Sequence, residues 1–270
     1  MVRKMLNKGF KTHIVKALEE NFRLGKRKKD EYREISIEVG VFPKAEGSAR
    51  VRFGTTEVLA GVKMEINKPF PDTPEEGGIA VNMELLPLSN PDFESGPPQI
   101  EAIEMARVVD RCIRESKAID FKKLCITPGE AAWFISIDII SFNDNGNLLD
   151  ASALAAVAAI NDTKFPKLVD NKKVDYKSMT TKKLPINGTP VLVTVHKLGE
   201  HYFVDPDSDE EDFSDIRLSV ASLEKNILCA LQKGGDFALT EDDVLNMVDI
   251  ALRKGEEIRK LLKGAANDKK

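Results

Sequence analysis

Polar and apolar residues alternate in several short runs of the first half of the chain. The run REISIEVGVF places Ile35, Ile37 and Val39 on one side of an extended chain, which is the period of a half-buried strand. The runs ARVRFG, TEVLAGVKMEI, IAVNMELLPL and WFISIDIISF have the same β-rich character. Because Gly47 and Gly54 separate the first three runs by short turns, the pattern predicts an antiparallel meander.

Other segments repeat apolar residues at helical spacing. The predicted helices cover residues 13–22, 100–118, 148–160 and 240–262. In the first, Ile14, Ala17, Leu18 and Phe22 share one face. The last starts with Thr-Glu-Asp-Asp, which supplies an N-cap and an acidic first turn. Strands precede helices in each half of the chain. The order therefore predicts an α+β fold, with layers of mixed or antiparallel sheet and helices rather than an alternating parallel sheet.

The pattern also divides the chain into segments. Residues 1–30 hold an N-terminal helix and a basic loop, and residues 31–165 form a first lobe. Residues 166–188 are polar and rich in lysine, which is typical of a connection. Residues 189–270 form a second lobe that ends in a long helix.

Composition excludes several classes of protein. With 42% hydrophobic and 31% charged residues among 270, the chain has the composition of an ordinary water-soluble protein. No run approaches the roughly 20 apolar residues that span a bilayer. The first residues lack the apolar core of a signal peptide, so we expect a cytoplasmic location. Three scattered cysteines and three histidines without ligand spacing indicate neither disulfides nor a metal site. A net charge of −4 means that any contact with RNA must come from a local patch or be shared with a partner.

The stretch DNGNLLD, residues 144–150, joins a predicted strand to an alanine-rich helix. Free N–H groups at a helix N-terminus favour an anion, so this turn has the layout of a phosphate site. A working site adds a cation, whereas this turn offers Leu148 and then the carboxylate of Asp150. The same residues also fit a plain strand-to-helix turn with an acid in the first helical turn.

The predicted helix of residues 100–118 carries Arg107, Arg111 and Arg114 on one face. We expect Ile103, Ala106, Val109, Cys112 and Ile113 to lie on the other side, towards a core. Guanidinium groups in a row can hold successive RNA phosphates. The alternative is a solvated face, because Glu104, Asp110 and Glu115 stand three or four residues from these arginines.

Two further charged segments have less specific patterns. The acidic run 205–215 offers Asp205, Asp207 and Asp209 for proton transfer or Mg²⁺ binding, but a run of this kind is more typical of a solvated loop. The basic turn 26–29 is likewise typical of a solvated loop, with RNA or a partner as the alternative.

Four stretches together resemble a known family. They are KDEYREISIEVGVFPKAEGSARVRFGTTEVLAGVK, IEMARVVDRCIRESKAID, WFISIDIISFNDNGNLLDASALAAVAAI and FVDPDSDEEDFSDIRLSV. In this order, from about residue 10 to 262, they are similar to the RNase PH family of phosphorolytic exoribonucleases. Within the family they are most similar to the non-catalytic ring subunits of archaeal exosomes.

The resemblance implies roles for particular residues. Catalytic members carry a Gly-Gly-(Ser/Thr)-Arg stretch that holds the attacking phosphate. On this chain its hydroxyl position falls on Asn147 and its arginine on Leu148, which implies a degenerate, non-functional phosphate loop. Arg107 and Arg111 match arginines that face a partner's active site and hold the RNA 3′ end. Arg114 is a third candidate for RNA binding.

The expected function is therefore that of a non-catalytic subunit in a hexameric ring of three heterodimers, which degrades RNA from its 3′ end. The resemblance implies a catalytic RNase PH-like partner, RNA-binding cap proteins and single-stranded RNA as partners, and no membrane. We expect no catalytic residue, metal or cofactor in this chain. Inorganic phosphate, with Mg²⁺ as a second candidate ion, would act in the assembled complex. Two alternatives stay open: a self-sufficient phosphorolytic exoribonuclease and a purely structural ring scaffold.

Overall fold

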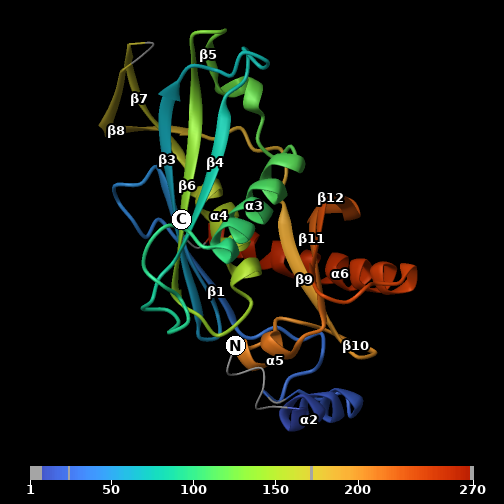
Figure 1. The fold of residues 1–270 in the computed structure, drawn as a ribbon. Coiled ribbons are helices and arrows are strands. Elements are labelled where there is room, and N and C mark those ends of the chain that lie inside the picture. The colour runs from blue at the N-terminus through green and yellow to red at the C-terminus, as the bar shows by residue number, and fades with distance from the viewer. Residues whose placement is uncertain (1–7, 24, 171–172, 268–270) are drawn as a thin grey trace.

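The computed structural model describes residues 8–23, 25–170 and 173–267. A six-stranded sheet forms its first part (Figure 1). The strand order is β1-β2-β3-β6-β4, with the short β5 paired to β6, and only the β4–β6 pair is parallel. The strands are β1 (Ile35–Val39), β2 (Gly47–Phe53), β3 (Thr56–Asn67), β4 (Gly78–Leu85), β5 (Cys125–Thr127) and β6 (Ala131–Asn143). The predicted meander of the first three strands is confirmed.

Helix α4 (Leu148–Asp162) is the centre of the core. Every residue from Leu148 to Ile160 is buried, because the helix packs against β2 and β3 and also against β9 (Val191–Leu198) of a second sheet. The approach to β2 is close. A Cβ on Gly47 would lie 2.3 Å from the carbonyl oxygen of Ala159, so only glycine fits there. The turn before α4 is therefore fixed at the junction of the two sheets.

A four-stranded antiparallel sheet forms the second part, in the order β10-β9-β11-β12. Its strands are β9 (Val191–Leu198), β10 (His201–Val204), β11 (Ile216–Leu223) and β12 (Ile227–Gly235). Helix α6 (Glu241–Asn267) packs on β9 and β11. The predicted N-cap is confirmed, since Thr240 Oγ1 accepts a hydrogen bond from the backbone N–H of Asp243 at 3.1 Å. The helix extends beyond the predicted end at residue 262.

Helix α3 (Ile100–Glu115) covers β4, and its buried residues include Val109, Cys112 and Ile113, as predicted. The prediction for Ile103 is wrong, because this side chain is 49% exposed. Ile103 stands four residues before Arg107, and residues at that spacing share one helical face. The exposed face of α3 therefore combines an apolar residue with arginines.

Helix α2 (Lys8–Glu19) and the short α5 (Ser208–Phe213) lie at one end of the molecule (Figure 1). Ile14 and Leu18 of α2 pack against Leu198 and Phe203 of the second sheet, as the helical face predicted. Phe22 does not belong to that face. It follows the end of the helix and is 49% exposed.

The β7–β8 hairpin and strand β12 were not predicted. Strands β7 (Lys164–Asp170) and β8 (Lys173–Lys183) form a separate antiparallel hairpin that begins two residues before the expected connection of residues 166–188 and otherwise lies within it. Strand β12 was missed because none of its residues is fully buried and its larger apolar side chains are exposed. Ile227, Leu228 and Leu231 are 53%, 45% and 40% exposed on this edge strand. Among the described residues, short 3₁₀ turns cover Phe121–Leu124 and Glu224–Asn226. Within the described ranges, no helix is long and apolar enough to cross a bilayer.

Candidate functional site

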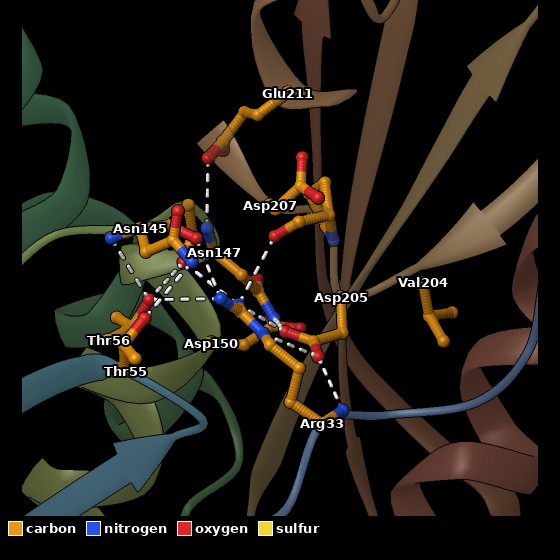
Figure 2. Close-up of polar contacts among 12 residues, drawn as sticks. Arg33, Thr55, Thr56, Asn145, Asn147, Asp150, Val204, Asp205, Asp207 and Glu211 are labelled. Atoms are coloured by element: carbon orange, nitrogen blue, oxygen red, sulfur yellow. Dashed lines mark hydrogen bonds and ion pairs between the residues drawn. The ribbon is translucent and has the colours of Figure 1, made fainter. Parts of the chain in front are cut away.

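The turn between β6 and α4, residues 144–147, is the centre of the candidate site (Figure 2). Gly146 has φ +81°, and a Cβ on it would lie 2.6 Å from the backbone carbon of Asp207. Asn147 follows in the left-handed region with φ 59° and forms the N-cap without a side-chain cap bond. The turn is therefore pressed against the segment that precedes α5, which leaves no room for a larger residue at position 146.

Arg33 holds this turn from the side of its carbonyl groups. Its guanidinium donates hydrogen bonds to the carbonyl oxygens of Asn145 at 2.7 Å and Gly146 at 3.1 Å. It also forms a two-pronged ion pair with Asp205, at 2.7 and 3.0 Å. Asn147 Nδ2 donates to the same carboxylate at 2.9 Å. Burial alone would raise the pKa of Asp205, but the hydrogen bonds and charge of Arg33 outweigh it and lower this pKa.

The acidic segment 205–215 is only in part the solvated loop that its composition predicted, because Asp209 is exposed but other carboxylates are buried. Asp205 and Glu210 are 0% and 1% exposed. The buried Arg23 pairs with Glu210 and donates to the backbone oxygen of Asp205, and Arg27 reaches Asp205 Oδ2 at 2.9 Å. Asp207 caps α5 by accepting from the Glu210 N–H at 2.9 Å. The prediction failed for Asp205 and Glu210 because arginines from the segment before β1 neutralise these carboxylates, which composition alone does not reveal.

Arg27 also corrects the interpretation of the basic turn 26–29. Its guanidinium is only 13% exposed and is engaged with Asp205. Lys29 Nζ lies 3.3 Å from His201 Nδ1 of β10. At least these two cations of the turn are therefore tied to the second sheet rather than fully solvated.

Two N–H groups of the turn, those of Gly146 and Asn147, are taken by the chain's own carboxylates. Gly146 N–H donates to Asp144 Oδ1 at 2.9 Å, and Asn147 N–H donates to Glu211 Oε2 at 2.9 Å. Figure 2 shows Glu211 reaching the turn from α5. Burial raises the pKa of Glu211 to about 7, although the hydrogen bond from Asn147 opposes this shift. Carboxylates of this chain thus occupy two of the N–H donors that an incoming anion would need.

Leu148 and Asp150 complete the first turn of α4. Leu148 is 3% exposed and belongs to the hydrophobic core, so no cation stands at its position. Asp150 is 1% exposed and points to β9, where it accepts hydrogen bonds from Thr194 N at 3.0 Å and Thr194 Oγ1 at 2.7 Å. Burial raises the pKa of Asp150 to about 7. Asp150 therefore links α4 to the second sheet.

A cleft of about 680 Å³ opens beside this turn. Eight carboxylate side chains line it, and its only lysine or arginine residues in the described ranges are Lys11 and Arg217. Both are already neutralised, since Lys11 pairs with Asp215 at 2.5 Å and Arg217 with Glu104 at 2.7 Å. His196 in the wall adds no charge, because burial lowers its pKa to about 3. The electrostatics of the cleft therefore disfavour a phosphate dianion.

The arginines of α3 have different surroundings. Arg107 is exposed, and its side chain forms no ion pair or hydrogen bond within the described ranges. Arg111 donates to Gln232 Oε1 at 3.0 Å, and more weakly to the carbonyl oxygen of Leu231 at 3.4 Å. Arg114 is bound by Asp110, four residues before it on the helix, at 2.8 and 3.0 Å. The alternative of a solvated, ion-paired face thus describes Arg114, whereas Arg107 is available to a ligand.

The site contains residues that the sequence did not single out. Arg33 and Glu211 control the turn, yet each stands far from it in the sequence. In the sequence, Arg33 and Glu211 were recognisable only as parts of charged segments, and the charge of a residue does not indicate which residue it will contact. The structure gathers no group of three or more metal-binding side chains among its described residues.

The fold and this site define the class of protein. The model of the 3′ exoribonuclease family, RNase PH domain 1, matches residues 31–166, and the model of domain 2 matches residues 188–254. The chain therefore belongs to the RNase PH-type 3′ exoribonuclease family, as the four sequence stretches indicated. The prediction of an RNase PH-like α+β fold is confirmed.

The particular proteins that the chain resembles are components of exosome complexes. It is 46% identical to the exosome complex component Rrp42 of Methanothermobacter thermautotrophicus over 233 residues, which is 86% of each chain. It is also 46% identical to Rrp42 of Thermococcus kodakarensis over 254 residues, 93% of each chain. Among solved structures, a chain of the Archaeoglobus fulgidus exosome with RNA bound to the active site superimposes with a TM-score of 0.86. That chain is 42% identical, and the match covers 93% of this chain and 96% of that one.

Proposed function

We propose that this chain is a non-catalytic subunit of an archaeal exosome ring. In the ring it alternates with a catalytic RNase PH-like subunit in three heterodimers, supports that subunit's active site and binds RNA during 3′-to-5′ phosphorolysis. Inorganic phosphate acts at the partner's site, and Mg²⁺ is a second candidate ion there. RNA-binding cap proteins are further partners. The similarity to Rrp42 proteins over 86% or more of the chain supports this assignment.

The observation that best supports a non-catalytic role is that the turn before α4 lacks a cation and that carboxylates of the chain accept hydrogen bonds from two of its N–H groups. Glu211 of this chain accepts the Asn147 N–H, and the apolar Leu148 fills the position where the family's catalytic members place arginine. Phosphorolysis needs positive charge and free donors around the attacking phosphate in a partly dry site. Losing one charged clamp costs on the order of a few kcal/mol in transition-state binding, about 100-fold or more in rate.

The α3 arginines support a role in RNA binding. Arg107 presents to solvent a guanidinium that is unpaired among the described residues, and Arg111 stands one helical turn away with part of its hydrogen-bonding capacity unused. Such groups hold phosphate oxygens of RNA at sites where the partner performs the chemistry. Arg114 contributes less, because Asp110 already binds it.

The test is release of nucleoside diphosphate from single-stranded RNA, with and without phosphate. We expect no phosphorolysis by this chain alone and phosphate-dependent release after assembly with a catalytic partner. Neutralising Asp207 in this chain should leave the activity of the ring unchanged, because this side chain caps α5 and takes no part in the reaction. Disrupting the partner's phosphate loop should abolish it. Steady phosphate-dependent release by this chain alone, at a rate comparable to the ring's, would favour the self-sufficient exoribonuclease instead.

A further inference from the structure

The β7–β8 hairpin concentrates positive charge in a chain that is negative overall. Residues 163–183 contain seven lysines and two aspartates, hence a formal charge of +5, whereas the whole chain carries −4. Six of the seven lysines are described, and all six are exposed. They are Lys164, Lys167, Lys173, Lys177, Lys182 and Lys183.

These ammonium groups lack carboxylate partners among the described residues. None of the six forms an ion pair within that part of the chain. The carboxylate of Asp175, the one acid of the hairpin whose surroundings are described, instead accepts hydrogen bonds from Ser178 Oγ at 2.7 Å and Lys177 N at 3.0 Å. Lys164 and Lys183 stand directly opposite each other in the strand register. Like charges at opposed positions destabilise a strand pair, and a bound polyanion removes that repulsion.

The same hairpin carries an exposed aromatic ring. Tyr176 on β8 is 50% exposed, and the ammonium of Lys63 from β3 lies 5.1 Å from its ring centroid. A strand pair that carries both exposed lysines and an exposed aromatic ring matches the chemistry of single-stranded nucleic acid, because ammonium groups attract phosphates and the ring stacks on a base.

The hairpin is separate from the site before α4. Figure 1 shows it beside the end of β3, at the opposite end of the molecule from α2 and α5. Lysines of this kind act as flexible point charges, so they suit a backbone of any sequence rather than a single phosphate.

We propose that the β7–β8 hairpin is a second RNA-binding surface, which contacts the phosphodiester backbone through its lysines and stacks a base on Tyr176. The choice of RNA as the polyanion rests on the proposed function. The surface itself depends on neither the α3 arginines nor the turn before α4.

The test measures binding of labelled single-stranded RNA to the reconstituted ring between about 50 and 300 mM salt. The variant combines Lys167→Gln, Lys173→Gln and Lys177→Gln, all exposed on the hairpin. We expect about 10-fold weaker binding at low salt. The slope of log affinity against log salt should fall by about 2, since each phosphate contact to a single strand contributes about 0.7.

A charge-matched control combines Lys16→Gln, Lys260→Gln and Lys263→Gln, which are exposed on α2 and α6. It should retain the original affinity and slope. Tyr176→Leu separates stacking from charge. It should weaken binding about 5-fold or more and leave the salt slope unchanged, because loss of one stacked base removes no phosphate contact.

Equal affinity and slope for the hairpin and control variants would overturn the proposal. Failure of the hairpin variant to assemble into the ring, with its fold intact by circular dichroism, would also overturn it and make the hairpin a protein interface. A parallel variant with Arg107 and Arg111 replaced distinguishes RNA binding by the hairpin from RNA binding by the α3 arginines. Loss of binding in the hairpin variant alone would keep this surface and refute the arginine contact.

Discussion

Replacing Asp150 by asparagine should change how stability depends on pH. This carboxyl is 1% exposed and carries a pKa of about 7, raised first by burial from an ordinary value of 3.8. The folded protein therefore binds this proton more tightly than the unfolded chain. Its contribution to stability is fully present below about pH 4, is lost as the pH rises towards 7, and is absent above that.

The magnitude follows from the shift. A difference of about 3 pKa units at about 1.4 kcal/mol each corresponds to a loss of about 4 kcal/mol, as an upper bound, between pH 4 and pH 8. The amide introduced by Asp150→Asn would keep both contacts to Thr194, because its oxygen accepts from the backbone N–H and its nitrogen donates to the hydroxyl. The variant carries no charge at this position, so it should lack this part of the pH dependence.

The assay is urea unfolding of the purified chain at several pH values from 5 to 8. Asp150→Asn should gain stability relative to the natural chain as the pH rises. The control is Asp249→Asn, an exposed position on α6, which should follow the natural chain throughout. If Asp150→Asn and the natural chain show parallel pH profiles, the burial argument for this carboxyl is refuted.

Three further changes test other parts of the site. Changing Arg107 and Arg111 to Glu should leave the fold intact but weaken RNA binding by the ring and lower its salt slope by about 1 to 2; unchanged affinity and slope would support a purely structural scaffold. Asp205→Ala should lower the free energy of unfolding by about 3–5 kcal/mol, because it strips Arg33 of its buried partner; a loss below about 1 kcal/mol in urea unfolding would contradict this. Leu148→Arg should still give no phosphorolysis by the isolated chain and should lower its melting temperature, because the new charge enters a buried position; phosphate-dependent product release would contradict the argument.

Local patterns were sufficient for the elements with a buried face. The alternation in residues 35–39 and the N-cap at Thr240 each follow from short-range chemistry that the structure retains. The hairpin β7–β8 and the edge strand β12 escaped prediction for a common reason. Apart from Phe165 and Pro166, their described residues are exposed or only partly buried, so no clear hydrophobic period marks them.

The sequence by itself determined that the turn before α4 lacks a cation, because Leu148 has no charge in any conformation. It also determined, through the order of four stretches, which family the chain belongs to. Only the tertiary structure decided what fills the turn instead. Glu211 and Arg33 reach it across 64 and 112 residues of chain, and Asp150 turns from the helix end towards β9. A charged side chain in the sequence specifies a need for a partner, but the choice among many possible partners is made when packing brings one of them within hydrogen-bonding distance.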